Sequence, residues 1–263
     1  MLTQSAKYYA RFPGDAELVR RVVLHLAAQP GEAVALPTGG RLSPRGLQLL
    51  GWGFGGAGGM EAVHYLLESA FETDVAGGGG EAGPERLSLA FLRGYEATLP
   101  FDTNPLYALI HEACYASGSG VGTNWAAQRI RSRPDVAPLF DAVALASSGA
   151  DVPFTGEVVF PWLFEDVASL RPLAGVAQLL AKKSDWAPLY DAQQLRANTV
   201  GVAATAYFED LYVDFDLAQE TLRQVNGARC WVTNEFLHSG VREDGPRVFN
   251  TLLAMARDED PVR

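Results

Sequence analysis

The sequence predicts an α/β protein whose strands lie in the last third of the chain. Val200–Phe208 is a nearly unbroken apolar run, which is typical of a parallel strand buried on both faces. The run ends at the acidic residues Glu209 and Asp210. A short helix with Asp216 as its expected N-cap follows, and Cys230–Val232 is predicted to form a second strand. This order of strand, helix and strand indicates a parallel βαβ unit.

His238 lies in the loop predicted beyond the second strand. In an α/β-hydrolase fold the catalytic residues follow the chain order nucleophile, acid and histidine. A carboxylate at Asp210 would accept the proton of one imidazole nitrogen and stabilise the imidazolium that forms when the other nitrogen takes a proton. The spacing therefore allows Asp210 and His238 to be two triad members in contact. In the alternative interpretation, Asp210 only ends a strand and His238 is a loop histidine.

The composition of the 263 residues is that of an ordinary globular protein, with 48% hydrophobic and 20% charged residues. The net charge of −10, without any basic cluster longer than a pair, argues against nucleic acid and anionic membranes as partners. Cys114 and Cys230 lack the spacing of a metal site or a disulfide framework, so we expect a reducing compartment and no cofactor. Without a signal-peptide pattern or a membrane-spanning apolar segment, the expected location is the cytoplasm.

The first three quarters of the chain are predicted to be mainly helix and loop. A helix capped by Asp15 is expected to continue to Leu26. Val34–Leu36 and Arg41–Leu42 are expected to form a small hairpin, and Ser43-Pro44 begins the next helix. Further segments are expected in this order: a helix at 60–71, a glycine-rich insertion at 77–80, helices at 85–98, 104–116 and 124–133, a loop at 152–164 and a helix at 169–183. Because two strands alone do not make a stable sheet, the predicted βαβ unit implies strands that this sequence does not contain.

Seven blocks of sequence along the chain indicate a family more specifically than the order of strands and helices does. They are AKYYARFPGDAELVRRV (6–22), RLSPRGLQLLGWGFGG (41–56), MEAVHYLLESAF (60–71), NPLYALIHEACY (104–115), FTGEVVFPWLFED (154–166), AYFEDLYVD (206–214) and WVTNEFLHSGV (231–241). Together and in this order, these blocks resemble the larger, helical-capped proline iminopeptidases (prolyl aminopeptidases) of the α/β-hydrolase superfamily. The likeness covers nearly the whole chain.

The resemblance implies a large helical cap over residues 1–197, with a pocket for the substrate amine. Residues 198–263 would then be the C-terminal segment of the α/β-hydrolase core. The resemblance also favours Asp210 over its acidic neighbours Glu209 and Asp214 as the residue that orients the histidine. In the family, the first half of the sheet and the nucleophile precede the cap, and that half has no counterpart in this sequence.

The sequence offers no nucleophile for the predicted triad. No serine stands in a Gly-x-Ser-x-Gly frame. The nearest match, Ser117–Gly122, has serine and valine where the frame needs glycine, and it follows a predicted helix where an elbow must follow a strand. We therefore expect the chain to be inactive alone. A short gene model, a frameshift or a split gene would each produce such a chain, and the missing half is a candidate partner.

As the resemblance implies, the substrate is a peptide or amino-acid amide with a free N-terminal proline, whose ammonium is bound by two cap glutamates. These match Glu112 and Glu165 in this sequence. A carboxylate in a mostly apolar pocket suits this task because the ion pair is poorly screened there. In the alternative interpretation, both are solvated helix residues. Two alternative functions stay open: a non-catalytic helical module that binds an amine or proline, and another hydrolase activity such as an esterase.

Overall fold

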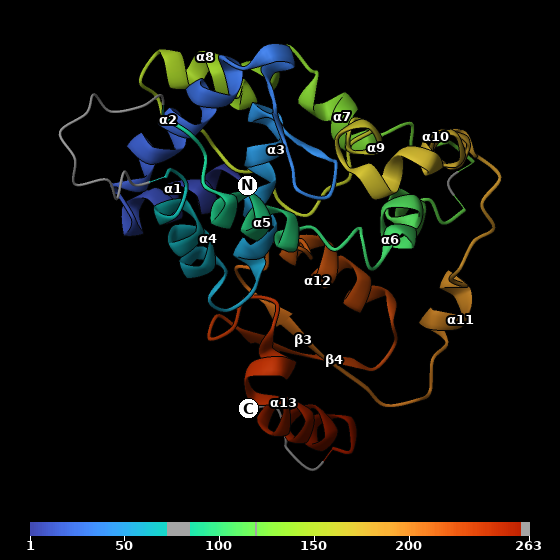
Figure 1. The fold of residues 1–263 in the computed structure, drawn as a ribbon. Coiled ribbons are helices and arrows are strands. Elements are labelled where there is room, and N and C mark those ends of the chain that lie inside the picture. The colour runs from blue at the N-terminus through green and yellow to red at the C-terminus, as the bar shows by residue number, and fades with distance from the viewer. Residues whose placement is uncertain (73–84, 119, 259–263) are drawn as a thin grey trace. The chain divides into compact units, whose positions relative to one another are not determined.

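The computed structural model describes residues 1–72, 85–118 and 120–258 (Figure 1). The predicted glycine-rich insertion at 77–80 lies outside the described residues. The elements are α1 (Leu2–Arg11), α2 (Asp15–Ala27), β1 (Val34–Ala35), β2 (Arg41–Leu42), α3 (Pro44–Leu47), α4 (Gly59–Glu68), α5 (Leu89–Thr98), α6 (Pro105–Ile110), α7 (Ala126–Arg131), α8 (Ala142–Ser147), α9 (Leu163–Asp166), α10 (Ala174–Lys182), α11 (Ala192–Arg196), β3 (Val202–Tyr207), α12 (Phe215–Gln224), β4 (Ala228–Thr233) and α13 (Gly240–Ala256). Short 3-10 helices span Pro30–Glu32, Gln48–Gly55, Glu112–Tyr115, Ala137–Phe140 and Ala168–Leu173.

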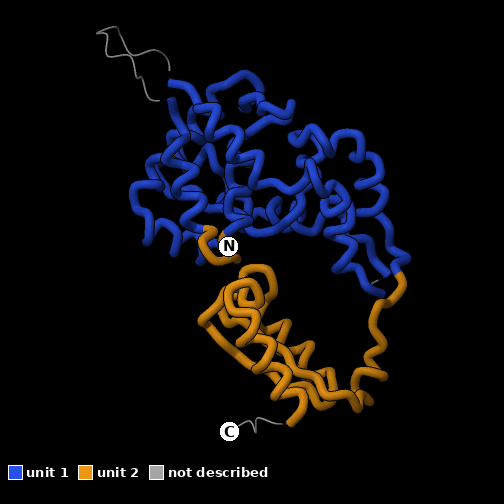
Figure 2. Tube along the Cα trace, turned by 60° about the horizontal axis from the view of Figure 1, so that its bottom comes forward, with its two compact units in different colours: residues 1–53, 60–186 blue, residues 54–59, 187–263 orange. Residues whose placement is uncertain are grey.

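The chain divides into two compact units, which Figure 2 shows in different colours. The larger unit comprises Met1–Gly53 and Met60–Trp186, and the smaller comprises Phe54–Gly59 and Ala187–Arg263. The division predicted from the sequence has its boundary after residue 197 and keeps residues 54–59 with the first part. The assignment of these parts to a cap and a hydrolase core stays a prediction.

Helix α2 supplies much of the core of the larger unit. Val19, Val22, Val23 and Leu26 on its apolar face are fully buried, as the pattern predicts, whereas Leu18 is half-buried. The prediction that Asp15 caps this helix is wrong, because Gly14 is the N-cap and the Asp15 carboxylate is engaged elsewhere. It accepts a hydrogen bond from the Tyr8 hydroxyl and lies 3.0 Å from Nδ1 of His64.

The predicted hairpin and the helix start after it are both present. Strands β1 and β2 pair antiparallel, with Val34 opposite Leu42. The hydroxyl of Ser43 then caps α3 by accepting a hydrogen bond from the backbone N–H of Gly46 at 3.2 Å, and Pro44 occupies the first helical position. The segment therefore leads directly from the hairpin into a tight helical turn.

A second hydrophobic cluster of the larger unit brings together residues that are distant in sequence. Trp52 meets Phe101 edge-on, with ring centroids 5.5 Å apart, and Phe160 stacks on Trp162 at 5.1 Å. The buried members of the cluster are Leu49, Trp52, Phe101, Ala108, Val159, Phe160, Trp162, Leu163, Phe164, Leu170 and Ala177.

All five helices predicted between residues 60 and 183 are shorter than their patterns indicate, and α4, α7 and α10 account for three of them. The helix expected at 85–98 begins at Leu89, because Leu87 pairs with Phe71 in an antiparallel bridge and the Ser88 hydroxyl caps the helix. The helix expected at 104–116 ends at Ile110 and continues as a 3-10 turn, a common way for a helix C-terminus to tighten.

The smaller unit is built on the predicted βαβ unit. Strands β3 and β4 pair parallel, from Val202 opposite Ala228 to Tyr207 opposite Thr233, with α12 as the connection. Both α12 and α13 contact the two strands, and Figure 1 shows them on opposite sides of the pair. The protein is therefore α/β, with helices throughout and two small two-stranded sheets among the described residues.

The prediction that the first strand is buried on both faces is wrong. Val200 is 70% exposed and Phe208 is 59% exposed, and Ala206 is the one buried residue in β3. Among the described residues β3 pairs with β4 alone. The burial pattern of β3 shows that α12 and α13 cover its faces only in part. The cap predicted for α12 is also wrong: Asp214 accepts from the Leu217 N–H at 3.0 Å, whereas Asp216 already lies inside the helix.

Two further sequence expectations concern the surroundings of the protein. Cys114 and Cys230 are both free thiols. No helix of the described residues has the length and apolarity that a membrane span requires. The cytoplasmic location stays a prediction.

Candidate active site

Asp210 and His238 form a hydrogen-bonded pair in the smaller unit. Asp210 lies just beyond the end of β3, and His238 lies in the loop between β4 and α13. The Nδ1 atom of His238 is 2.9 Å from Oδ2 of Asp210. The contact predicted from the sequence is therefore present, and the catalytic role of the pair stays a prediction.

The turn after β3 fixes the Asp210 carboxylate. Its Oδ1 atom accepts hydrogen bonds from the backbone N–H groups of Tyr212, at 2.8 Å, and Val213, at 3.0 Å. A short acidic side chain closes such a turn on its own backbone. The side chain is only 5% exposed, so solvent competes weakly for it, and Oδ2 is left to meet the histidine.

Residues 54–59 support His238 from a distant part of the sequence. The backbone N–H of His238 donates to the carbonyl of Gly55 at 2.9 Å, and the Ser239 hydroxyl accepts from the N–H of Ala57 at 3.1 Å. A Cβ atom at Gly55 would lie 2.5 Å from the Tyr212 ring, so glycine is required there. The Tyr212 ring meets the His238 ring edge-on, with centroids 5.0 Å apart. Gly55 and Tyr212 are thus positioning residues that the sequence analysis missed.

The pair sets the protonation pattern of the imidazole. An ionised carboxylate only accepts hydrogen bonds, so the ring nitrogen that faces it carries a proton. In the neutral ring Nε2 keeps its lone pair and can act as a base. The His238 side chain is 46% exposed. Within the described part of the chain, the pair has no hydroxyl or thiol hydrogen-bonded to the imidazole.

Glu112 lies in the larger unit, at the start of the 3-10 turn that follows α6, and is half-buried. Its Oε2 atom accepts hydrogen bonds from the Thr123 hydroxyl and from the backbone N–H of Trp125, the latter at 2.9 Å. Its Oε1 atom has no hydrogen bond among the described residues. This oxygen can accept hydrogen bonds from a ligand ammonium.

Burial favours the neutral form of the neighbouring His111. Burial lowers the pKa of His111 below its ordinary value, against the opposing charge of Glu112 and a backbone hydrogen bond to Glu157. The ring packs against Tyr107 and Tyr115, at centroid distances of 5.3 and 5.7 Å. A neutral imidazole leaves the negative charge of Glu112 uncompensated from this side.

Glu165 lies in a different environment from Glu112. Its side chain is 69% exposed, and Oε2 is 3.4 Å from Arg41 and 3.8 Å from Arg45. The next residue, Asp166, is the buried carboxylate of this region: its side chain is 4% exposed and binds both arginines. Among the described residues, Glu112 and Glu165 therefore share no hydrogen-bond or ion-pair partner of their carboxylates. The sequence analysis did not identify Asp166 as a buried carboxylate. A local indication existed, because Asp166 follows buried Trp162 by four residues and so lies on the same helix face.

In the part of the chain that the structure describes, no three or more His, Cys, Asp or Glu side chains gather in a way that could hold a metal ion.

Comparisons with known proteins bear on what this site does. No protein-family model matches the chain. Over 251 residues it is 41% identical to a proline iminopeptidase of Aeromonas sobria, an alignment that covers 95% of this chain and 54% of the relative. The chain is a homologue of proline iminopeptidases. A second relative, proline iminopeptidase aneH of Aspergillus aculeatus, is 32% identical over 255 residues, covering 95% of this chain and 52% of the relative.

The similarity to proline iminopeptidases agrees with the resemblance carried by the seven sequence blocks. It extends over both units, since it covers 95% of the chain. The chain spans about half the length of the curated relatives it matches.

Proposed function

We propose that this chain carries the acid, the histidine and the helical cap of a serine exopeptidase that releases N-terminal proline from peptides. The hydrogen bond between Asp210 and His238 is the observation that carries the proposal. The similarity to proline iminopeptidases supports the choice of reaction. The proposed substrate is a peptide or amino-acid amide with a free N-terminal proline.

In the proposed reaction His238 transfers a proton in each step. Its Nε2 atom takes the proton of a serine hydroxyl while the serine oxygen attacks the prolyl carbonyl carbon. The imidazolium then gives this proton to the leaving amine as the C–N bond breaks, which leaves a prolyl ester on the serine. Water attacks this ester by the same proton route and releases free proline. Asp210 stays ionised throughout, holds the Nδ1–H group and stabilises the imidazolium.

The serine comes from outside these 263 residues in this proposal. No Gly-x-Ser-x-Gly frame occurs in the sequence. The chain spans 54% and 52% of its two relatives, so each has further sequence in which such a frame could lie. The chain alone is then expected to leave proline 4-nitroanilide intact.

Glu112 is the proposed acceptor for the substrate ammonium. Its Oε2 atom is already held by Thr123 and Trp125, so the carboxylate has a fixed orientation with Oε1 available. The exposed Glu165 faces two arginines, which compensate its charge, and it contributes less in this proposal.

Reconstitution tests the proposal. The chain is expressed with the part of the Aeromonas sobria protein that it does not match, and release of 4-nitroaniline from proline 4-nitroanilide is measured. Turnover that needs both parts and disappears with His238→Ala supports the proposal. Turnover by the chain alone that His238→Ala abolishes would contradict the missing nucleophile. A reconstituted protein that hydrolyses 4-nitrophenyl acetate but no prolyl substrate would favour an esterase.

A non-catalytic amine-binding module is the second candidate. It is favoured by one observation: Glu112 and its two hydrogen-bond donors all lie in the larger unit, which contains neither Asp210 nor His238. Calorimetry of the chain with proline separates the candidates, since the module binds proline without any second half.

A further inference from the structure

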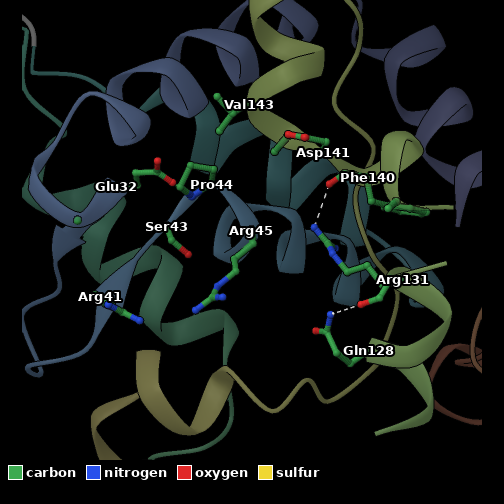
Figure 3. A pocket seen from close by; sticks show the side chains of 14 residues that line it. Glu32, Arg41, Ser43, Pro44, Arg45, Gln128, Arg131, Phe140, Asp141 and Val143 are labelled. Atoms are coloured by element: carbon green, nitrogen blue, oxygen red, sulfur yellow. Dashed lines mark hydrogen bonds between the residues drawn. The ribbon is translucent and has the colours of Figure 1, made fainter. Parts of the chain in front are cut away.

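The larger unit contains a pocket of about 470 Å³ that the proposed reaction does not use. It is lined by α3, by α7 and by the segment that leads into α8, and Figure 3 shows its side chains. Its lining carries three arginines and two carboxylates: Arg41, Arg45, Arg131, Glu32 and Asp141. A pocket of this volume falls in the usual range of small-molecule sites.

Two of the arginines already have counter-charges. Asp166 forms an ion pair with Arg41 and lies 3.3 Å from Nη2 of Arg45. Arg45 is also held over the ring of Trp162, with its guanidinium carbon 4.6 Å from the ring centroid. These side chains are fixed by the protein itself and require no ligand.

Arg131 is different, because no carboxylate of the described residues lies within ion-pair distance of it. Its Nη2 atom donates to the carbonyl of Phe140 at 2.9 Å and to Oε1 of Gln48 at 2.5 Å. Its Nη1 atom is buried and has no hydrogen-bond partner in the described part of the chain. Burial and the positive charge of Arg45 lower the pKa of Arg131 to about 10, although Asp141 acts in the opposite direction. A buried guanidinium with an unused N–H is costly unless an anion compensates it.

Gln128 adds a second unsatisfied group to the same wall. Its Nε2 atom donates to the hydroxyl of Ser132 at 3.0 Å, and its buried Oε1 atom lacks a hydrogen bond among the described residues. The nitrogen and oxygen of an amide are interchangeable by a half-turn. In the turned orientation the oxygen accepts from the Ser132 hydroxyl, and the NH₂ group takes the place of the unpaired oxygen, where it can donate a hydrogen bond to a ligand.

We infer that this pocket binds a small molecule through an oxyanion group, a carboxylate or a phosphate, held by Arg131 and the turned amide of Gln128. A guanidinium matches the planar geometry of a carboxylate and the edge of a phosphate. Glu32 and Asp141 on the same lining disfavour further negative charge, so the ligand carries a single anionic group. This inference is independent of the proposed peptidase activity.

An NMR titration of the chain tests the site. Propionate, inorganic phosphate and the neutral isostere propionamide are added at constant ionic strength, and the side-chain amide resonance of Gln128 is followed. Saturable shifts with an anion and none with propionamide support the site. A larger affinity for propionate assigns a carboxylate ligand, and a larger affinity for phosphate assigns a phosphate. The absence of saturable shifts with both anions overturns the inference.

Variants distinguish anion binding in this pocket from a general effect of the protein's charge. Arg131→Gln is expected to weaken anion binding about tenfold or more, because it removes a charged donor. Arg133→Gln is the matched control, since Arg133 is 59% exposed and pairs with Asp135. Gln128→Leu removes the second donor without changing the charge, so it tests the site even where Arg131→Gln does not fold. Equal binding by Gln128→Leu, Arg133→Gln and the unmodified chain overturns the inference.

Discussion

The Nδ1 atom of His238 lies 2.9 Å from Oδ2 of Asp210, and the two residues follow the ends of neighbouring parallel strands. The other oxygen of Asp210 is held by two backbone N–H groups of its own turn. The carboxylate therefore cannot turn away from the imidazole without breaking these bonds. This arrangement fixes the orientation of the ring before any substrate binds.

The substitution Asp210→Asn tests the carboxylate in the reconstituted enzyme. Asparagine keeps an oxygen for the turn but presents an amide donor to Nδ1, which favours the wrong tautomer. We expect kcat for proline 4-nitroanilide to fall about 10⁴-fold, as in serine peptidases with the equivalent change. Asp214→Asn is the control, because Asp214 only caps α12 and asparagine is an equally good cap. Equal losses in both variants would show that Asp210 has no special role.

The substitution Gly55→Ala tests the support of the histidine. The added methyl group would lie 2.5 Å from the Tyr212 ring, which packs against His238. We expect the free energy of unfolding to fall by about 1–3 kcal/mol, as in overpacked cores, with a shift of the His238 ring resonances. Gly245→Ala in the same unit is the control, since its added methyl group meets no atom within 4 Å. An unchanged thermal melt and unchanged His238 resonances in Gly55→Ala would refute this contact.

The sequence could predict the acid and histidine contact because its signals are local. The apolar run marks one strand, Cys230–Val232 marks the next, and the ends of parallel strands meet at one sheet edge. The support from Gly55 could not be predicted in this way, because it depends on a contact between the first quarter of the chain and the last. The cap of α12 was misassigned for another reason: Asp214 and Asp216 are both good caps, and only the backbone conformation decides between them.

The substitution Glu112→Gln tests the proposed amine site. Glutamine keeps the shape and the bonds to Thr123 and Trp125 but removes the charge that would meet the substrate ammonium. We expect KM in the reconstituted enzyme to rise at least about tenfold, because a hydrogen bond to a charged group is lost. Glu165→Gln should change KM less than about twofold, since an exposed ion pair contributes little. The reverse order of effects would assign the site to Glu165.

We expect His111 to make the stability of the larger unit depend on pH. Because burial lowers its pKa in the folded protein, the unfolded chain binds a proton first as the pH falls below about 6.5. The folded state therefore loses stability in that range, down to the lowered pKa. We expect the melting temperature of His111→Gln to fall less than that of the unmodified chain on acidification. If the melting temperatures of the two proteins fall equally on acidification, His111 is not the group responsible for the loss of stability.

The burial of Asp166 is a feature that the resemblance did not indicate. The match to a family motif selected Glu165, yet the fold buries its neighbour Asp166 against Arg41 and Arg45. The helical spacing from buried Trp162 is a local indication that Asp166 is buried. Its pairing with Arg41 and Arg45, far apart from it in sequence, has no such local pattern.

The tautomer of His238 in the unmodified chain shows whether Asp210 orients the imidazole ring. The ¹⁵N chemical shifts of the imidazole report which ring nitrogen carries the proton, and comparison with His238→Gln assigns the signal. We expect the proton of the neutral imidazole to lie on Nδ1, and this pattern to change in Asp210→Asn. A ring that carries its proton on Nε2, with shifts unaffected by Asp210→Asn, would contradict this expectation.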